Sequence, residues 1–236
     1  MELPVFYAKE LIPGAASFTM DEPTSKYCIQ VLRRQKGDKV LLADGKGHRY
    51  EAEITDDHRK KCVTAITNVE SMPHPEPGIR IAIAFTKNAA RMEWFLEKAV
   101  EIGVQGIIPL VTLRTEKEKL KAERLENILV SAMLQSRQWF LPELSEPTPL
   151  ESLMSTTGQR FIAHCLPGDK PHLLAAMQPG KDTILLVGPE GDFVPQEVDL
   201  ALQYGFTPVS LGNTRLRTET AGMVGCALMA AVNAAK

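Results

Sequence analysis

The chain has 236 residues, of which 44% are hydrophobic and 24% are charged, and its formal net charge is -2. This composition is typical of a folded soluble protein and excludes a disordered or fibrous one. Because the net charge is close to zero, a surface for nucleic acid would have to come from local clusters of basic residues.

The cysteines and the chain ends indicate an intracellular protein without a metal. Cys28, Cys62, Cys165 and Cys226 lie far apart and form no C-x-x-C motif, so we expect reduced thiols and neither zinc nor disulfides. The N-terminal sequence MELPVFYAKE lacks the basic start and apolar run of a signal peptide. The apolar C-terminal tract is too short for a membrane span. We therefore expect a cytoplasmic protein with no membrane partner.

Residues 1–71 are predicted to form a small β-rich domain. Alternation of apolar and polar residues predicts half-buried strands, and one short helix is expected over 25–34. The predicted strands cover residues 39–44, 48–55 and 62–69. This pattern favours a β-barrel-like module, a shape that often holds nucleic acid.

The segment SMPHPEPG separates this domain from the rest of the chain. Its closely spaced prolines and final glycine oppose regular structure, so residues 72–78 are predicted to be an extended linker. Residues 79–236 then form a second domain.

Strand and helix patterns alternate through residues 79–236, which predicts an α/β fold. Short apolar runs of the kind found in parallel strands lie at 79–85, 106–111, 160–165, 183–188 and 207–212. Helical patterns lie between and after them, at 88–102, 117–140, 195–204 and 218–235. In such folds ligands bind beyond the carboxyl ends of the strands.

The first candidate binding loop lies in LLVGPEGDF. A predicted buried strand ends at Gly188, and the chain turns through Pro189, Glu190 and Gly191. Glycines on either side of a proline let main-chain groups approach a ligand closely. An ordinary strand-to-helix turn explains the isolated motif equally well. The motif is neither G-x-G-x-x-G nor a phosphate loop, which disfavours dinucleotides and nucleoside triphosphates.

The second candidate loop lies in SLGNTRLRTETAGMVGCALMAAV, residues 210–232, where a polar run precedes an apolar helix. Main-chain donors at a helix start attract anions, and Thr218 or Thr220 is a suitable cap. The simpler alternative is a capped helix in which Arg217 pairs with Glu219. Two such loops at neighbouring strand ends favour a binding site.

Together, VGPEGDF and LGNTRLRTETA resemble the C-terminal signature of the SPOUT class of RNA methyltransferases, and in particular the RsmE family, which methylates N3 of one uridine in 16S ribosomal RNA. The segment TKNAARMEWFLEKAVEIGVQGIIPL (86–110) resembles the same family, and residues 31–54 resemble its PUA-like domain. Two positions depart from the family pattern. Tyr27 or Cys28 stands where a histidine usually precedes VLR, and Leu134 stands where the family has glutamate.

The resemblance implies a SPOUT-type domain with a trefoil knot, preceded by a small PUA-like β-barrel domain. It also implies a homodimer that binds S-adenosylmethionine and acts on 16S rRNA, in the assembled small ribosomal subunit. Carried over position by position, the cofactor-binding residues are His164, Leu166, Val187, Gly188, Pro189, Glu190, Gly191, Leu211, Gly212, Leu216, Arg217, Thr218, Thr220 and Ala221.

Methylation of uridine N3 requires loss of its proton, and a fixed cation stabilises the anion that forms. Arg217 is the first candidate for that cation, with Glu219 orienting it, and both are predicted catalytic residues. Glu190 and Glu219 are alternatives for the proton acceptor. No metal is required.

The predicted RNA-binding residues are Arg33, Arg34, Lys36, Lys87 and Arg91. Basic clusters bind phosphates, although a solvated basic face explains any single cluster as well.

Two other functions remain compatible with the residues. One is a non-catalytic RNA-binding or ribosome-assembly factor that keeps the fold. The other is a knotted methyltransferase that acts on transfer RNA or on a ribose hydroxyl. The LRTETA motif and the small N-terminal domain favour the RsmE family.

Overall fold

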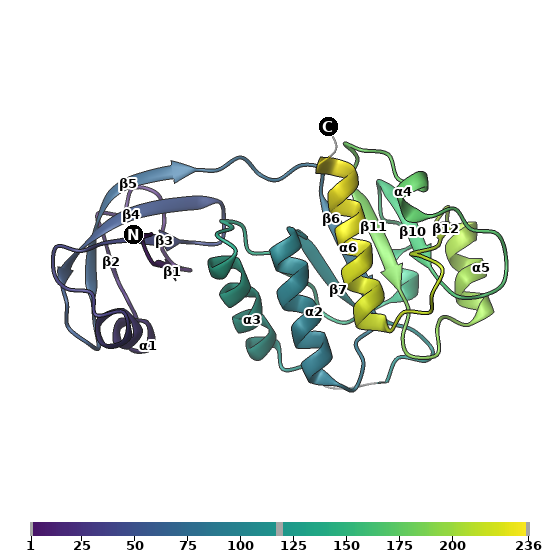
Figure 1. The fold of residues 1–236 in the computed structure, drawn as a ribbon, viewed down its shortest axis with the longest axis horizontal. Helices are drawn as coiled ribbons and strands as arrows, with labels where there is room; N and C mark the ends of the chain where they lie inside the picture. The colour runs from purple at the N-terminus through teal and green to yellow at the C-terminus, as the bar shows by residue number, and fades with distance from the viewer. Residues whose placement is uncertain (1, 117–119, 235–236) are drawn as a thin grey trace. The chain divides into compact units, whose positions relative to one another are not determined.

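The structure is a computed structural model, and it describes residues 2–116 and 120–234. The chain divides into two compact units (Figure 1). The first contains Met1–His74 and Met133–Leu141, and the second contains Pro75–Ala132 and Pro142–Lys236.

The first unit contains a five-stranded sheet in the order β1-β3-β4-β5-β2. β1 pairs with β3 in parallel, and the remaining pairs are antiparallel. In the described residues no pairing joins β1 to β2, so the hydrogen-bonded order of the expected β-barrel-like module is open. The strands are β1 (Val5–Tyr7), β2 (Ser17–Thr19), β3 (Lys39–Ala43), β4 (His48–Asp56) and β5 (Val63–Ser71).

The helix of the first unit begins earlier than the sequence predicted. α1 (Glu22–Lys26) continues into the π-helical turn η1 (Tyr27–Val31). The carboxylate of Asp21 accepts a hydrogen bond from Thr24 N at 2.8 Å. This N-cap fixes the helix start ahead of the expected range, residues 25–34.

The second unit contains a seven-stranded sheet, with the order β12-β10-β11-β6-β7-β8 and with β9 also paired to β7. All of these pairs are parallel. The strands are β6 (Ile79–Ile83), β7 (Gly106–Val111), β8 (Glu143–Leu144), β9 (Thr148–Pro149), β10 (Gln159–Ala163), β11 (Thr183–Val187) and β12 (Thr207–Val209). The parallel α/β prediction is confirmed, although β8 and β9 were not predicted.

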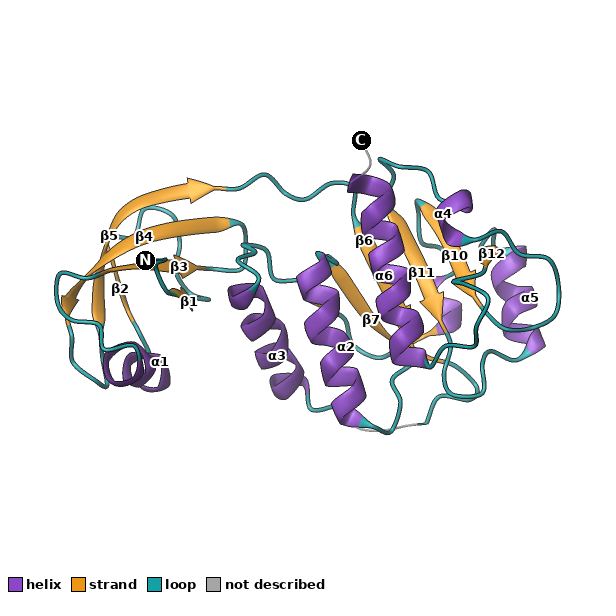
Figure 2. Cartoon of the chain, in the orientation of Figure 1, coloured by secondary structure: helices purple, strands orange, loops and turns teal. Residues whose placement is uncertain are grey.

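Helices cover the second sheet (Figure 2). They are α2 (Ala89–Ile102), α3 (Ala122–Gln135), the 3-10 turn η2 (Leu150–Leu153), α4 (Leu173–Ala176), α5 (Pro195–Gln203) and α6 (Thr218–Ala234). The helix expected over 117–140 is shorter, because Arg137 has a positive φ of 55°. The first part of that range, 117–119, lies outside the described residues.

Alternate residues of the central strands pack on opposite faces of the sheet. Ile83 and Leu185 lie against the glycines of α6. Ala82 and Leu186 belong to a buried cluster with Val198 of α5. α6 also packs against α2, as Figure 1 shows. A sheet that is covered on both faces leaves its strand ends as the place for a site.

Candidate active site

A cavity of about 420 Å³ lies beyond the carboxyl ends of β10 and β11. Its walls come from the two strand ends, the loop after β11, the segment before α6, and the first turns of α2 and α6. The lining residues are Arg91, Ala163, Cys165, Val187, Gly188, Pro189, Glu190, Gly191, Asp192, Arg215, Leu216, Arg217, Thr218 and Ala221. Segments that lie far apart along the chain therefore meet at one edge of the sheet.

The second unit also has a larger cavity, of about 700 Å³, near the starts of α2 and α3. Its lining is mostly apolar and includes Phe85, Pro109 and Leu125. Neither candidate motif contributes to it, so we place the site at the smaller cavity.

The loop after β11 is held in shape by its own sequence. A Cβ on Gly188 would lie 3.0 Å from ring atoms of Phe193, and Gly191 has a positive φ of 92°, so both positions favour glycine. Asp192 also has a positive φ, 67°. Its carboxylate accepts hydrogen bonds from Cys165 N at 2.6 Å and from Phe193 N at 2.9 Å. This side chain ties the loop to the end of β10.

Arg114, in the segment after β7, supports the outer side of this loop. Its guanidinium donates hydrogen bonds to the carbonyl oxygens of Gly191 and Asp192. The adjacent residue is also fixed, because Leu113 N donates to the buried carboxylate of Glu197 at 2.8 Å. Glu197 accepts a second hydrogen bond, from Val194 N at the start of α5.

The two candidate loops are joined directly. The hydroxyl of Thr218, the first residue of α6, donates to the carbonyl oxygen of Gly188 at 3.2 Å. Arg217 precedes the helix, and its carbonyl oxygen accepts from Ala221 N at 2.7 Å. The polar residues at the start of an otherwise apolar helix therefore form one wall of the cavity.

The buried carboxylate of this helix pairs with a different arginine from the one expected. Glu219 lies 3.6 Å from the guanidinium of Arg91, whereas the sequence assigned it to Arg217. Arg91 also lies 3.6 Å from Glu190. One arginine of α2 thus connects α6 with the loop after β11.

The cavity brings together many of the predicted cofactor-binding residues. Those that line it are Val187, Gly188, Pro189, Glu190, Gly191, Leu216, Arg217, Thr218 and Ala221. The predicted cofactor-binding residues that do not line it are His164, Leu166, Leu211, Gly212 and Thr220, and the predicted catalytic residue Glu219 does not line it either. Cys165 and Arg215 also line it and lie within the predicted loops 164–166 and 211–218, whereas Ala163 and Asp192 line it without having been predicted. Among these, the position of Asp192 directly after the GPEG motif was a usable signal.

His164 lies next to this wall. Its Nδ1 atom is buried and has no hydrogen-bond partner among the described residues. Burial, and secondarily the charge of Lys170, lowers the pKa of the imidazole from its ordinary value. This environment therefore favours the neutral form of the ring.

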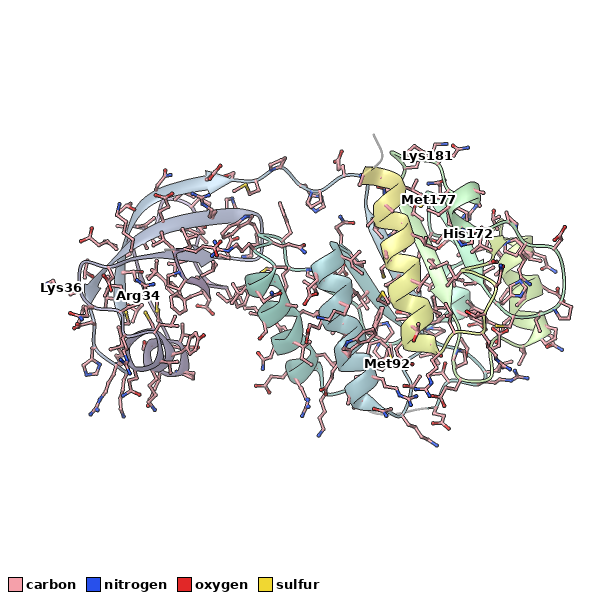
Figure 3. All side chains as sticks on the ribbon, in the orientation of Figure 1. Arg34, Lys36, Met92, His172, Met177 and Lys181 are labelled. Carbon is pink, nitrogen blue, oxygen red and sulfur yellow. The ribbon has the colours of Figure 1, made fainter. Side chains whose placement is uncertain are left out.

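The predicted RNA-binding residues are distributed over both units. Arg33, Arg34 and Lys36 lie in the segment before β3, and Figure 3 labels Arg34 and Lys36 there. The Nε atom of Arg34 is buried without a partner in the described part of the chain. Lys87 forms an ion pair with Glu116 at 2.7 Å, and Arg91 lines the cavity.

The described residues contain no group of three or more His, Cys, Asp or Glu side chains suited to a metal ion. In residues 2–116 and 120–234, no helix is long and apolar enough to cross a membrane.

Comparisons with known proteins identify the two domains. The sequence model of an RNA methyltransferase domain matches residues 74–230, and that of an RNA methyltransferase PUA domain matches residues 21–67. The chain therefore has the domains of an RNA methyltransferase.

Individual relatives define the family more narrowly. The ribosomal RNA small subunit methyltransferase E of Synechocystis is 30% identical over 222 residues, which cover 90% of this chain and 72% of the relative. The crystal structure of a probable rRNA-methyltransferase from Porphyromonas gingivalis has 39% identity and a TM-score of 0.93, over 99% of both chains. That of ribosomal RNA small subunit methyltransferase E from Neisseria gonorrhoeae, bound to S-adenosyl methionine, has 25% identity and a TM-score of 0.86, over 98% of both chains.

The chain belongs to the ribosomal RNA small subunit methyltransferase E family, RsmE. The resemblance seen in the sequence motifs is confirmed, as is the α/β methyltransferase fold with a PUA-like domain.

Proposed function

We propose that this protein transfers a methyl group from S-adenosylmethionine to N3 of one uridine in 16S ribosomal RNA of the small ribosomal subunit. Family membership supports the reaction class. The Neisseria gonorrhoeae relative, solved with S-adenosyl methionine, supports the methyl donor. The observation that carries the proposal is the hydrogen bond from Thr218 to Gly188, which joins the two signature loops around one cavity.

The residues around the cavity fit this cofactor. A volume of about 420 Å³ suits a small-molecule site. The glycines at 188 and 191 expose main-chain groups of the loop, and Glu190 adds a carboxylate, which suits a cationic sulfonium. We propose that the cofactor is held by the predicted residues that line the cavity, namely Val187, Gly188, Pro189, Glu190, Gly191, Leu216, Arg217, Thr218 and Ala221. We propose that the other predicted residues support those that line the cavity; they are His164, Leu166, Leu211, Gly212 and Thr220.

The protein contributes alignment and charge. When bound, the cofactor supplies the methyl group, whose bond to sulfur breaks, with the electron pair going to sulfur, as the bond to N3 forms. Holding the uracil ring in line for this displacement can contribute on the order of 7–11 kcal/mol. Arg217 stabilises the negative charge that remains when N3 loses its proton to water at the cavity mouth, where Glu190 is 70% exposed.

Arg217→Ala is expected to reduce the methylation rate far more than the affinity for S-adenosylmethionine. Calorimetry for the affinity and a radiolabelled methyl-transfer assay for the rate measure the two effects. Equal losses in both would remove the role of Arg217 as a catalytic cation.

We propose that the first unit, residues 1–71 in the sequence prediction, supplies the RNA-binding surface, and that residues 79–236 form the catalytic domain. The match to a PUA domain supports the first assignment, and Arg33, Arg34 and Lys36 are its candidate phosphate contacts. RNA binding should then weaken steeply with salt. A flat salt dependence would contradict these contacts.

We also propose the trefoil knot, a homodimer, and action in the cytoplasm. Membership of the family supports the knot, because the resemblance to that family implies a knotted domain. The apolar length of α6 supports a helix that packs both in the core and on a partner copy.

Mass-spectrometric mapping of 16S rRNA from cells with and without the protein tests the proposed function. Loss of one 3-methyluridine is the expected result, and the purified protein should restore it on small subunits. An unchanged 16S rRNA with an altered transfer RNA or ribose would transfer the activity to another substrate. No change in any RNA would favour an assembly factor.

A further inference from the structure

We infer that Arg91 is a second catalytic cation, which binds one carbonyl oxygen of the target uracil while Arg217 binds the other. This inference rests on the proposed function and adds the recognition of the base to it. Both arginines line the same cavity but come from different elements. Arg91 lies in the first turn of α2, and Arg217 immediately precedes α6.

Arg91 is held in place but keeps its hydrogen-bond donors. In the described residues, its side chain has two carboxylate partners, Glu219 and Glu190, each at 3.6 Å. This distance gives charge attraction without a normal hydrogen bond. A guanidinium has five N–H donors in a planar fork, so donors remain for a ligand.

The two carboxylates differ in their surroundings. The Glu219 side chain is 8% exposed and belongs to α6, whereas the Glu190 side chain is 70% exposed and belongs to the loop after β11. Oε2 of Glu219 is buried and lacks a partner among the described residues. Glu219 therefore anchors Arg91 from the interior, and Glu190 is the partner that an incoming uracil oxygen can displace.

The chemistry of uracil suits two cations. Carbonyl oxygens flank N3 on both sides, and both take up negative charge when N3 loses its proton. One guanidinium at each oxygen stabilises that anion before the methyl group arrives. The proton goes to water, the N3–C bond forms, and the C–S bond breaks with its electron pair left on sulfur. Cytosine has an amino donor in place of one oxygen, so the arginine at that side would face another donor.

Other ionisable groups also surround the cavity and bear on any pH effect. They are Cys165 after β10, Glu190 and Asp192 after β11, Arg215 and Arg217 before α6, and Glu219 on α6. The carboxylate of Asp192 is occupied by two main-chain donors. Arg91 is the cation of this group that is anchored by a buried carboxylate.

The test compares Arg91→Met with Lys98→Met. Lys98 is a matched control, because it lies on the same helix, its side chain is 32% exposed against 34% for Arg91, and it pairs with two carboxylates, Glu97 and Glu101. Methylation of small ribosomal subunits is measured from neutral to alkaline pH at saturating S-adenosylmethionine. Donor affinity is measured by calorimetry, and thermal unfolding checks the fold.

Arg91→Met should lower kcat roughly 100- to 1,000-fold at neutral pH. The pH at which kcat rises should also increase by about one unit or more, because N3 then loses its proton less readily. Lys98→Met should match the wild type. Arg91→Lys, which keeps the charge but not the fork, should lie between the wild type and Arg91→Met.

Three results would overturn the inference. They are an unshifted pH profile in Arg91→Met, a loss of donor affinity as large as the loss of rate, and an equal loss in Lys98→Met. If Arg91→Met does not fold, Arg91→Lys decides by the same pH measurement. A wild-type protein that methylates no uridine would instead refute the proposed function, which separates the two failures.

Discussion

Gly222, one turn into α6, determines how closely this helix approaches the sheet. A Cβ at this position would lie 2.6 Å from Cδ1 of Ile83 and 2.7 Å from Cε2 of Phe95. Phe95 is completely buried, so its ring has no free space to move into. Overpacking of this kind costs about 1–3 kcal/mol, while replacing glycine by alanine inside a helix returns about 1 kcal/mol. We expect Gly222→Ala to lower the free energy of unfolding by up to about 2 kcal/mol.

Gly225→Ala is the matched control on the same helix. A Cβ there would meet the end of one flexible side chain, Cδ2 of Leu185, at 2.3 Å, and the next nearest atom lies at 3.8 Å. Leu185 is buried as well, but only the end of this one side chain must shift. The cost of that shift and the helix-propensity gain should nearly cancel, which leaves stability within about 0.5 kcal/mol of the wild type.

Calorimetry or urea unfolding measures the difference between the two variants. At about 2–4 °C per kcal/mol for a chain of this size, Gly222→Ala should melt several degrees below Gly225→Ala. The packing argument would be refuted if the two variants melted together, or if Gly222→Ala were the more stable one.

Three further changes test the contacts around the site. Arg114→Ala removes the side chain that binds the carbonyl oxygen of Gly191. It should weaken S-adenosylmethionine binding roughly tenfold with little change in melting temperature. Unchanged affinity in calorimetry would exclude this supporting role. Glu197→Gln leaves one of the two main-chain donors facing an amide N–H. It should cost about 1–3 kcal/mol of stability in urea unfolding, and a neutral result would contradict the bridging role. Because the pKa of His164 is lowered in the folded protein, the unfolded chain binds a proton at this residue at a higher pH than the folded chain does. Stability therefore falls as the pH drops through 6.5, the ordinary value, toward the folded pKa. His164→Gln should remove that part of the pH dependence between neutral and mildly acidic pH, and parallel curves for variant and wild type would argue against it.

The elements with a clear local pattern were predictable. The apolar runs of β6, β7 and β11 and the period of α2 each occupy a continuous stretch, and the structure places them within a few residues of the predicted bounds. Two-residue strands such as β8 and β9 have no period to detect. α1 began earlier than predicted because a single capping aspartate fixes its start.

Much of the cavity wall was also visible in the sequence, because GPEG and LRTETA are short motifs whose residues remain neighbours after folding. The partners of those motifs were not visible. Glu219 was expected to serve Arg217, two residues away, but α6 packs against α2 and brings Arg91 to the carboxylate instead. Arg114 reaches the glycine loop from a segment that no local pattern connects to it.

Local chemistry in the sequence therefore determined the class of fold, the two loops and the family. The tertiary structure alone decided which charged groups meet at the cavity. The physical reason is that charge pairing depends on distance in space, and the order of strands in the parallel sheet brings together residues that are far apart along the chain.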